Sequence, residues 1–457
     1  MLIELQNFGP IKSFQFDTSK DIHAIFGKNN IGKSYAISAV YLILKNLSDY
    51  SYYDNEYTLD FALSYEKTAI EKTVEKRVFD LNFLKYDIKK EILEYFKGSL
   101  NTHLLSGINN SLKNTFDLNS IQNINSDCPI KIIISFSIGV LTIDFDTNPS
   151  KAVIGSLELT PNFEIYNSET NVNSTKDSFS FYIKNEENGE KVIYGLRSIM
   201  DTLHKNLKRD VKHFSNQIYF LPASRSGLYN ALNSFGAIFA ELSRNRNFIR
   251  QKIEIPNISE PISDYFLRLN TIDKAQVNEK YVEYFEEIEK DILKGTITLD
   301  TETKKYFYTP QHSEIKLELS FTSSMISEIA PIIAHLKYII PFGDKSTSIL
   351  FIEEPEAHLH PEVQVALLNF FVKLSKANVK IVMTSHSNYI FNKLSNLIIA
   401  KEIQPENISI SLMKMTNQGS VIEDGAMAVD EHGIEDNNFV DIAEQLYEER
   451  MQLLEKL

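Results

Sequence analysis

The stretch that decides the fold is Gly27-Lys28-Asn29-Asn30-Ile31-Gly32-Lys33-Ser34. It matches the pattern G-x-x-x-x-G-K-[ST], in which a glycine-rich backbone loop surrounds phosphate groups. Residues 23–26 read as a short buried strand, and apolar residues recur at helical spacing between Ala36 and Leu47. Strand, loop and helix therefore occur in the order that a phosphate-binding loop requires, and a nucleoside triphosphate is the first ligand to expect.

Each part of this loop has a physical role. Gly27 and Gly32 let the backbone turn closely and direct its N–H groups inward. Together with the N-terminus of the following helix, these donors form an anion site. The side chain of Lys33 reaches the β- and γ-phosphates, and the hydroxyl of Ser34 binds magnesium. We expect all eight residues to line a site for ATP and Mg²⁺, with Lys33 also acting in catalysis.

A second motif, this one acidic, follows an apolar strand much later in the chain. Residues 349–352 form a continuous apolar run, typical of a buried parallel strand, and Glu353 and Glu354 come directly after it. This is the Walker B arrangement. We expect Glu353 to bind the magnesium shell and Glu354 to orient or polarise the attacking water.

A histidine ends the next apolar strand, residues 379–384, within the sequence Thr-Ser-His-Ser at 384–387. A histidine at the end of a strand beside a nucleotide site can hydrogen-bond the γ-phosphate or the attacking water. His386 is therefore a third candidate catalytic residue, beside Lys33 and Glu354.

These motifs together resemble a known family. The opening LQNFGPI at 5–11, the P-loop, FIEEPEAHLHP at 351–361 and TSHS at 384–387 look like the ABC-type ATPases of the SMC, RecF and OLD (overcoming lysogenisation defect) group. The long acidic string is closest to the OLD-like members. The resemblance covers about the first 47 residues and roughly residues 315–400.

The resemblance implies a head-to-head dimer that holds ATP between the P-loop of one copy and a signature motif of the other. Here Ser323 and Ser324 stand at the signature position and would contact the γ-phosphate across the interface. The glycine usual after the serines is Met325 in this chain. Residues 357–360 would form the D-loop at the same interface. Gln217 is a weak candidate for the Q-loop glutamine, and Arg225 is a better candidate for a nucleotide or interface contact.

The resemblance and the hydropathy pattern divide the chain into three parts. The fold class we expect is α/β: a P-loop ABC-type ATPase head with a mixed sheet, plus an inserted α+β region. Residues 1–47 and 315–457 would form the head, with 215–227 adding a sheet strand. Residues 48–214 would be the inserted α+β region, including an irregular loop over 101–127 and an antiparallel sheet from three alternating runs. Residues 228–314 would be a mostly helical insertion.

Composition limits where the protein works and what it binds. The 457 residues carry a net charge of −14, so the whole surface is not that of a DNA-binding protein, although a local basic face is compatible with nucleic acid. One candidate face carries lysines and arginine from Lys205 to Lys212, and a second spans 244–252. Cys128 is the single cysteine, and no apolar run is long enough for a bilayer, so we expect a cytoplasmic protein without membrane insertion.

The expected function is that of an ATPase without an effector of its own. OLD nucleases carry a Toprim nuclease domain after the ATPase, whereas few residues follow His386 here, and the acidic residues among them read as a solvated segment. The chain resembles stand-alone ATPase subunits of anti-phage systems, PARIS- or Septu-like, which act with a separate nuclease or toxin. Two alternatives stay open: a RecF- or SMC-like repair ATPase that binds DNA directly, and a slowly hydrolysing, nucleotide-locked scaffold.

Overall fold

A computed structural model gives the fold of the chain. It describes residues 1–50, 85–87, 89–116, 121–123, 128–145, 151–167, 173–174, 178–183, 190–212, 217–231, 258–270, 272, 281–340, 347–423, 427–434 and 440–454. Within these ranges no helix is both long and apolar enough to cross a membrane.

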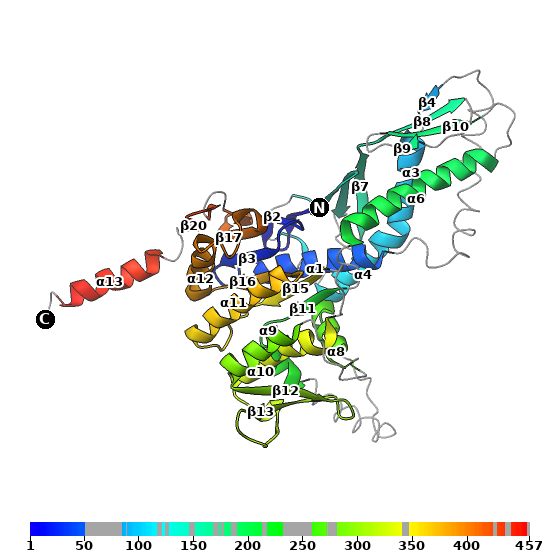
Figure 1. Cartoon of the computed structure of the whole chain (residues 1–457). Helices are drawn as coiled ribbons and strands as arrows, with labels where there is room; N and C mark the ends of the chain where they lie inside the picture. Colours follow the sequence, from blue (N-terminus) through cyan, green and yellow to red (C-terminus); the bar gives the residue numbers. More distant parts are fainter. Residues whose placement is uncertain are drawn as a thin grey trace, which may run out of the picture.

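One large mixed sheet organises the described part of the chain (Figure 1). In spatial order it contains β11 (Ile218–Leu221), β15 (Ser348–Glu353), β16 (Val379–Ser385), β3 (Ile22–Gly27), β17 (Ile408–Thr416), β18 (Gly419–Ile422), β2 (Ile11–Asp17), β1 (Leu2–Phe8), β5 (Lys131–Phe136), β6 (Gly139–Phe145) and β7 (Ala152–Leu159). The first five strands pair in parallel, whereas β2, β1, β5, β6 and β7 pair antiparallel. An α/β class with a large mixed sheet is therefore confirmed.

Helices cover both faces of the parallel part of the sheet. Taken together, the described part of the chain contains the helices α1 (Lys33–Asp49), α3 (Lys89–Leu100), α4 (Ser106–Thr115), α6 (Glu190–Lys212), α8 (Glu260–Asn270), α9 (Val282–Glu287), α10 (Ser324–Ala334), α11 (Pro361–Lys376), α12 (Asn388–Ile399) and α13 (Val440–Leu454). Single-turn π- or 3₁₀-segments occupy Asn101–Leu105, Ile288–Leu293, Leu319–Phe321, His335–Ile339 and Pro405–Asn407.

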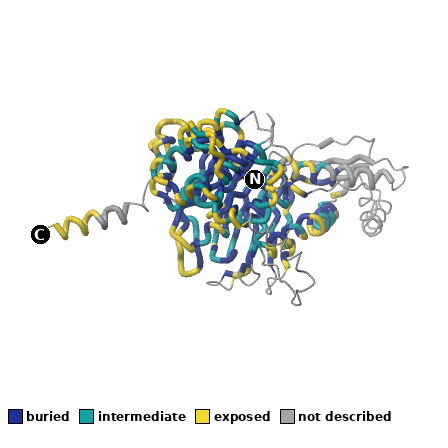
Figure 2. Tube along the Cα trace, turned by 90° about the horizontal axis from the view of Figure 1, so that it is seen from below, coloured by how far each residue is buried: buried dark blue, intermediate teal, exposed yellow. Residues whose placement is uncertain are grey.

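Alternate residues of the central strands enter two separate hydrophobic cores. In β3, Ile25 packs with α1, α3, α4 and α6, whereas Ala24 and Phe26 pack with α10, α11 and α12. In β15, Phe351 enters the first core and Ile352 the second. Because both faces are covered, successive residues are apolar over 24–26 of β3 and 349–352 of β15, as the sequence predicts. The buried interior runs through the middle of the molecule, as Figure 2 shows.

The segment 48–214 contributes to the same sheet rather than standing wholly apart from it. Strands β5, β6 and β7 extend the sheet antiparallel from β1. A separate sheet of β4 (Lys85–Asp87), β8 (Asn162–Asn167), β9 (Asn173–Ser174) and β10 (Ser178–Ile183) lies with α6 at one end of the molecule (Figure 1). The sequence predicts an antiparallel sheet from the alternating runs 131–146, 152–166 and 179–194. This is confirmed for β5, β6 and β7, whereas β8 and β10 run parallel in the separate sheet. The division into head and insertions stays a prediction.

Two local expectations for this part of the chain are wrong. Residues 101–115 are helical rather than an irregular loop, because Leu104, Leu105, Ile108 and Leu112 recur at helical spacing beneath the many Asn and Ser residues and are buried. The third alternating run, expected to continue as a strand to Tyr194, ends as strand at Ile183, and α6 begins at Glu190.

The region 281–321 contains a further small sheet. Strands β12 (Gly295–Asp300), β13 (Lys305–Pro310) and β14 (Leu317–Glu318) pair antiparallel. Alternating residues over 296–300 and 314–321 predict two strands here. The first is confirmed as β12, the second is reduced to β14 and a 3₁₀ turn, and β13 lies between them without having been predicted. The described part of residues 228–314 is helical before this sheet, in α8 and α9.

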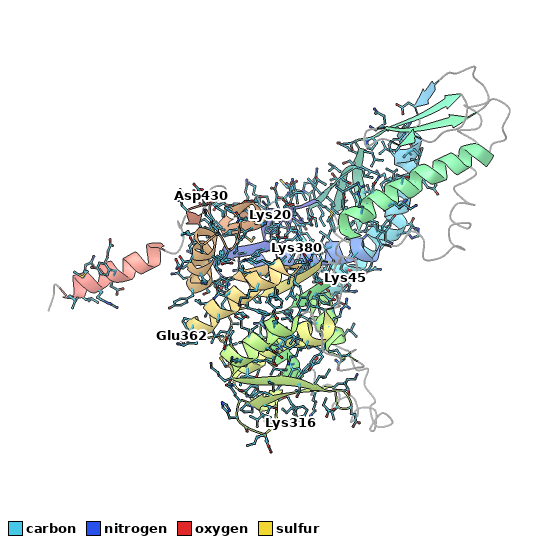
Figure 3. The ribbon with its side chains drawn as sticks, viewed as in Figure 1. Lys20, Lys45, Lys316, Glu362, Lys380 and Asp430 are labelled. Atoms are coloured by element: carbon cyan, nitrogen blue, oxygen red, sulfur yellow. The ribbon has the colours of Figure 1, made fainter. Side chains whose placement is uncertain are left out.

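Two ion pairs join α1 to α8. Nζ of Lys45 on α1 bonds Glu260 at 2.8 Å and Asp264 at 2.5 Å, both on α8; Lys45 is labelled in Figure 3. The remaining elements are the two-stranded pair β19 (Val429–Asp430) and β20 (Gly433–Ile434), and α13, which lies apart from the other elements in Figure 1 and is exposed over 447–454.

Candidate functional site

The predicted site residues meet at one edge of the sheet. Strands β15, β16 and β3 are adjacent and parallel, so their carboxyl ends lie side by side. Glu353 is paired with Thr384, and Ser385 is paired with Phe26, the residue before the P-loop. Motifs that lie more than 300 residues apart in the sequence are therefore brought together by strand order alone. The carboxyl edge of such a sheet is the usual place for ligands in α/β proteins.

The P-loop adopts a conformation that its glycines require. Gly27 has φ of 143° and Gly32 has φ of 94°, both in the region that L side chains disfavour. A Cβ on Gly27 would lie 2.3 Å from Cδ1 of Ile31 and 2.6 Å from the carbonyl oxygen of Met413. Lys28, Asn29 and Asn30 are exposed, so the outer part of the loop is accessible to a ligand.

Lys33 is buried at the centre of the site. Its Nζ donates to the carbonyl oxygens of Gly27 and Lys28, at 2.9 Å each, and to Nε2 of His386 at 2.8 Å. Burial lowers the pKa of Lys33 to about 8, against the opposing attraction of Glu354 and then Glu356. The ammonium group is thus poorly solvated, and its three protein acceptors can be exchanged for the stronger charge of a phosphate group.

His386 lies between the lysine and the second acidic residue. Burial and the charge of Lys33 lower the pKa of His386, while Glu354 acts in the opposite direction. The neutral ring therefore accepts the hydrogen bond from Lys33, and its Nε2 is 3.5 Å from Oε1 of Glu354. His386 thus bridges Lys33 and Glu354, and all three side chains are candidate catalytic residues from the sequence.

Glu353 faces the first turn of α1. Burial raises its pKa, and hydrogen bonds from Ser34 and from the backbone N–H of Ala223 oppose that rise. A carboxylate and a hydroxyl oxygen in contact, next to a phosphate-binding loop, are the donors that Mg²⁺ takes from proteins in nucleotide sites. The two residues expected to bind magnesium therefore lie close enough to share one ion.

Glu356 is a site residue that was not singled out from the sequence. Its Oε1 accepts from the Ser385 hydroxyl at 2.8 Å and from the backbone N–H of His386 at 2.6 Å. Its Oε2 is buried without a hydrogen-bond partner, and burial raises its pKa. The available signal was a third carboxylate in the EEPE string, two residues beyond the pair given roles.

Two secondary candidates are not placed as expected. Gln217 precedes β11 and bonds the hydroxyl of Ser348, the first residue of β15, so it lies at the opposite edge of the sheet from Glu353. Arg225 is fully buried and donates to the carbonyl oxygens of Pro222, Glu353 and Glu354. Arg225 therefore supports the backbone of the acidic motif instead of presenting its charge to a nucleotide or an interface.

The two signature serines lie at an exposed helix end. Ser323 is the N-cap of α10, and its hydroxyl accepts from the backbone N–H of Ile326 at 3.5 Å. Ser323 and Ser324 are both exposed, and Phe321 just before them is 79% exposed. Met325 packs partly against the core formed by α10, α11 and α12. This surface is accessible to a second molecule.

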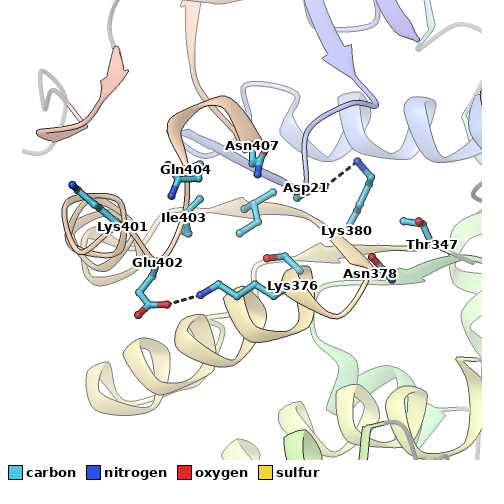
Figure 4. Close-up of a pocket in the computed structure, with 12 residues that line it drawn as sticks. Asp21, Thr347, Lys376, Asn378, Lys380, Lys401, Glu402, Ile403, Gln404 and Asn407 are labelled. Carbon is cyan, nitrogen blue, oxygen red and sulfur yellow. Dashed lines mark hydrogen bonds and ion pairs between the residues drawn. The ribbon is translucent and has the colours of Figure 1, made fainter. Parts of the chain in front are cut away.

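A cavity of about 480 Å³ lies away from these residues (Figure 4). It is at the amino edge of the sheet, where Asp21 and Ile22 begin β3 and Asn378 precedes β16. Lys376 is paired with Glu402, and Lys380 with Asp21, so two of its lysines already have acidic partners. The candidate site is the P-loop edge and not this cavity.

Comparison with known proteins gives a family. The model of the family described as "AAA ATPase domain" matches residues 1–391, a range that includes the P-loop, both acidic residues and His386. No curated protein matches the chain.

Three solved SMC heads are similar to the chain over most of its length. The SMC head domain from Thermotoga maritima is 10% identical with a TM-score of 0.35, covering 93% of this chain and 97% of that one. An SMC head bound to the C-winged helix domain of ScpA is 12% identical with a TM-score of 0.38, covering 92% and 96%. An SMC head with an extended coiled coil, bound to the C-terminal domain of ScpA derived from Pyrococcus furiosus, is 12% identical with a TM-score of 0.37, covering 98% of each.

The sequence identities and TM-scores of these SMC heads are too low to indicate what the chain binds. The family model, in contrast, covers most of the chain and includes the site residues. The chain belongs to the AAA ATPase domain family and is an ATP-binding P-loop hydrolase.

Proposed function

We propose that the chain is an ABC-type, OLD-like ATPase that closes head to head with a second copy on binding ATP and Mg²⁺. Closure and hydrolysis would control a separate effector protein, such as a nuclease or toxin, in anti-phage defence. The observation that carries the enzymatic part of this proposal is the contact of Lys33, Glu354 and His386 at the carboxyl edge of adjacent parallel strands. The effector and the defence role rest on the motif resemblance.

The residues divide the work of hydrolysis by their positions. The P-loop backbone and Lys33 bind the β- and γ-phosphates. Ser34 and Glu353 would hold Mg²⁺, which would supply positive charge against the phosphates. Glu354 accepts the proton of the attacking water, and His386 hydrogen-bonds the γ-phosphate or that water. Glu356 fixes the backbone of His386.

The second copy would complete each site. The exposed N-terminus of α10 carries free N–H groups and a positive partial charge that suit a phosphate. Ser323 and Ser324 add two accessible hydroxyl groups at that helix end. This surface supports the proposal that each ATP lies between the P-loop of one copy and α10 of the other.

Glu354→Gln tests the hydrolytic reading. Because a positioned general base contributes about 10²- to 10⁴-fold, we expect steady-state ATP hydrolysis to fall by at least about a hundredfold. ATP binding, measured by titration calorimetry, is expected to stay within a few fold, and the dimer to accumulate in size-exclusion chromatography with ATP. Equal, negligible hydrolysis by wild type and Glu354→Gln would contradict the hydrolase and favour a nucleotide-locked scaffold.

Specific observations keep the two alternatives open. Met325 places a side chain where the signature glycine usually lies, which favours slow turnover and a scaffold role.

Lys205, Lys208 and Arg209 are exposed on α6 and give a local basic face, which favours DNA contact. The second basic cluster, residues 244–252, lies outside the described part of the chain. DNA binding through such a face would weaken steeply with salt, which a filter-binding titration at several ionic strengths measures.

A further inference from the structure

Arg225 is a buried cation whose hydrogen bonds end on the acidic motif. Its Nη1 donates to the carbonyl oxygen of Glu353 at 2.8 Å and to that of Pro222 at 3.2 Å. Its Nη2 donates to the carbonyl oxygen of Glu354 at 3.4 Å. A guanidinium group offers five N–H donors in a fixed plane, so one side chain can hold several carbonyl groups in a set arrangement. Arg225 thereby fixes the backbone that leaves β15.

Glu354 needs such support because its backbone is in an unfavourable conformation. Its φ is 43°, in the left-handed region that residues other than glycine rarely adopt. A backbone of this kind persists only where neighbouring groups hold it. The N–H of Glu354 donates to the carbonyl oxygen of Thr384 on β16 at 3.1 Å. Its carbonyl accepts from the N–H of Ala357 at 3.0 Å, within the same loop, and from Arg225 at 3.4 Å. Arg225 thus joins this strained backbone to the rest of the core, and the direction of the Glu354 carboxylate depends in part on it.

Arg225 is in turn held by Glu328, which is also fully buried. Oε2 of Glu328 lies 3.2 Å from Nε of Arg225 and accepts from the Arg225 backbone N–H at 3.1 Å. Oε1 accepts from the Ser226 backbone N–H at 3.2 Å and hydroxyl at 2.7 Å. The same carboxylate thus caps the helical segment that begins at Arg225 and neutralises the guanidinium.

Glu328 lies on α10, one helical turn after Ser324. A continuous set of buried contacts therefore runs from the exposed end of α10, through Glu328 and Arg225, to the backbone of Glu354. In the proposed dimer these two ends serve different nucleotides, because Ser323 and Ser324 meet the ATP of the partner while Glu354 acts on its own.

Resting on that proposed function, we propose that Arg225 and Glu328 are positioning residues that couple the two ATP sites of the dimer. When the N-terminus of α10 engages the partner's nucleotide, Glu328 and Arg225 transmit the position of the helix to Glu354 and set its carboxylate for the attack of water. Neither residue touches ATP, so their loss changes turnover more than nucleotide binding.

Glu328→Gln and Arg225→Lys test the coupling, with Glu289→Gln as the matched control. Glu289 forms another buried ion pair, 2.6 Å from Lys337, with a side chain only 6% exposed and no contact to the site among the described residues. In Glu328→Gln and in Glu289→Gln alike, the glutamine has nearly the shape of the glutamate and removes one buried negative charge. Misplacing a catalytic group by about 1 Å can cost roughly a hundredfold in rate. We expect kcat to fall at least about tenfold in the two coupling variants, with KM within about twofold, and to stay near wild type in Glu289→Gln.

Hydrogen exchange measured by mass spectrometry gives a readout that needs no hydrolysis. With a non-hydrolysable ATP analogue, peptides covering 353–357 are expected to exchange faster in Glu328→Gln than in Glu289→Gln, while P-loop peptides stay protected in both. Equal exchange of 353–357 in the two variants, or equal kcat, overturns the coupling. Absence of hydrolysis by the wild type overturns the proposed function instead, and the exchange measurement still decides the coupling.

Ser226→Ala provides a milder variant should the loss of a buried charge prevent folding. It removes only the 2.7 Å hydrogen bond from the hydroxyl to Glu328 and leaves the ion pair in place. We expect a smaller fall in kcat, about two- to fivefold, in the same direction and with KM unchanged, as the loss of one hydrogen bond of about 1 kcal/mol implies. An unchanged kcat together with unchanged exchange of 353–357 counts against the coupling.

Discussion

Lys33 shows at the scale of a single residue how burial tunes a phosphate ligand. Its pKa is lowered to about 8, chiefly by desolvation. In the nucleotide-free protein the folded state loses this proton before the unfolded chain does, so this group makes stability rise with pH between about 8 and its ordinary value. A bound phosphate raises the pKa of Lys33 again, because its negative charge favours the protonated amine.

The affinity for ATP is therefore expected to weaken above pH 8. Since the neutral amine must take up a proton on binding, the dissociation constant rises about tenfold for each pH unit well above the pKa of Lys33. Calorimetric titrations between pH 7.5 and 9.5 measure this change. Lys28→Ala removes an exposed lysine of the same loop and should keep the same pH profile. A flat profile in the wild type would refute this account of Lys33.

Glu356 offers a second test at this scale. Its pKa is raised by burial, so its contribution to stability is lost as pH rises through that pKa, and the ionised form is unfavourable near neutrality. Glu356→Gln keeps an oxygen that can accept from Ser385 and from the His386 N–H. We expect the variant to be more stable than wild type at pH 7, in urea unfolding, because the amide places no charge in this buried site. A matching measurement near pH 4 should show a smaller gain, and a larger gain there would be inconsistent with this explanation.

At the scale of elements, the junction between β3 and α1 depends on one glycine. The strand β17 runs beside β3, and its Met413 carbonyl lies where a side chain on Gly27 would go. A hydrogen bond of 2.6 Å from the Ser420 hydroxyl to the Ile31 carbonyl holds the loop from β18. The P-loop is thus shaped by strands from the far end of the chain as well as by its own sequence.

Gly27→Ala is expected to displace the loop. The added Cβ would meet Ile31 and Met413, and φ of 143° disfavours alanine, so we predict a loss of about 1–3 kcal/mol in stability and at least about tenfold weaker ATP binding. Thermal unfolding and nucleotide titration measure the two effects. Gly227→Ala is the control, since nothing lies within 4 Å of its added Cβ and its backbone is helical. Similar behaviour of the two variants would mean that the loop is not held in this way.

At the scale of the whole molecule, one copy holds only half of the proposed ATP site. The P-loop and acidic residues meet within the chain, while Ser323 and Ser324 lie at an exposed helix end. In the proposed dimer a symmetric pair of copies would place each helix end on the other's nucleotide and give two equivalent sites.

Mixing two inactive variants tests this arrangement. Lys33→Ala removes the phosphate ligand, and Ser324→Arg blocks the helix end, so each is expected to hydrolyse ATP at least about a hundredfold more slowly than wild type. In an equal mixture half of the dimers contain both variants, and each of these has one intact site, so about a quarter of the wild-type rate returns where the two sites work independently. The proposed coupling lowers this value, because α10 of the copy with the intact P-loop carries the Ser324→Arg block, but the mixture still exceeds either variant alone. The separate variants at the same total concentration are the control, and a mixture no more active than these controls would contradict the shared site.

The sequence by itself determined the local chemistry. The P-loop spacing and the placing of Glu353, Glu354 and His386 directly after apolar strands predicted that these side chains lie together, because strand ends of one parallel sheet share an edge. Their roles in ATP binding and hydrolysis stay a prediction. The sequence also predicts a helix over 388–399 and strands over 217–222, 349–352, 379–384 and 408–413, because continuous apolar runs and helical spacing are local signals. The structure has these elements as α12, β11, β15, β16 and β17, with bounds that differ by at most three residues.

Only the tertiary structure decided how these side chains are supported. That Glu356 fixes His386, that Arg225 and Glu328 form a buried pair behind Glu354, and that Gln217 lies at the far edge follow from strand order and burial. A single sequence carries no local signal for the Arg225–Glu328 pair or for the place of Gln217, and for Glu356 it offers only the third carboxylate of the EEPE string. The continuation of the sheet into β5, β6 and β7 is of the same kind, because pairing between distant strands is set by the packing of the whole chain and not by the residues of either strand.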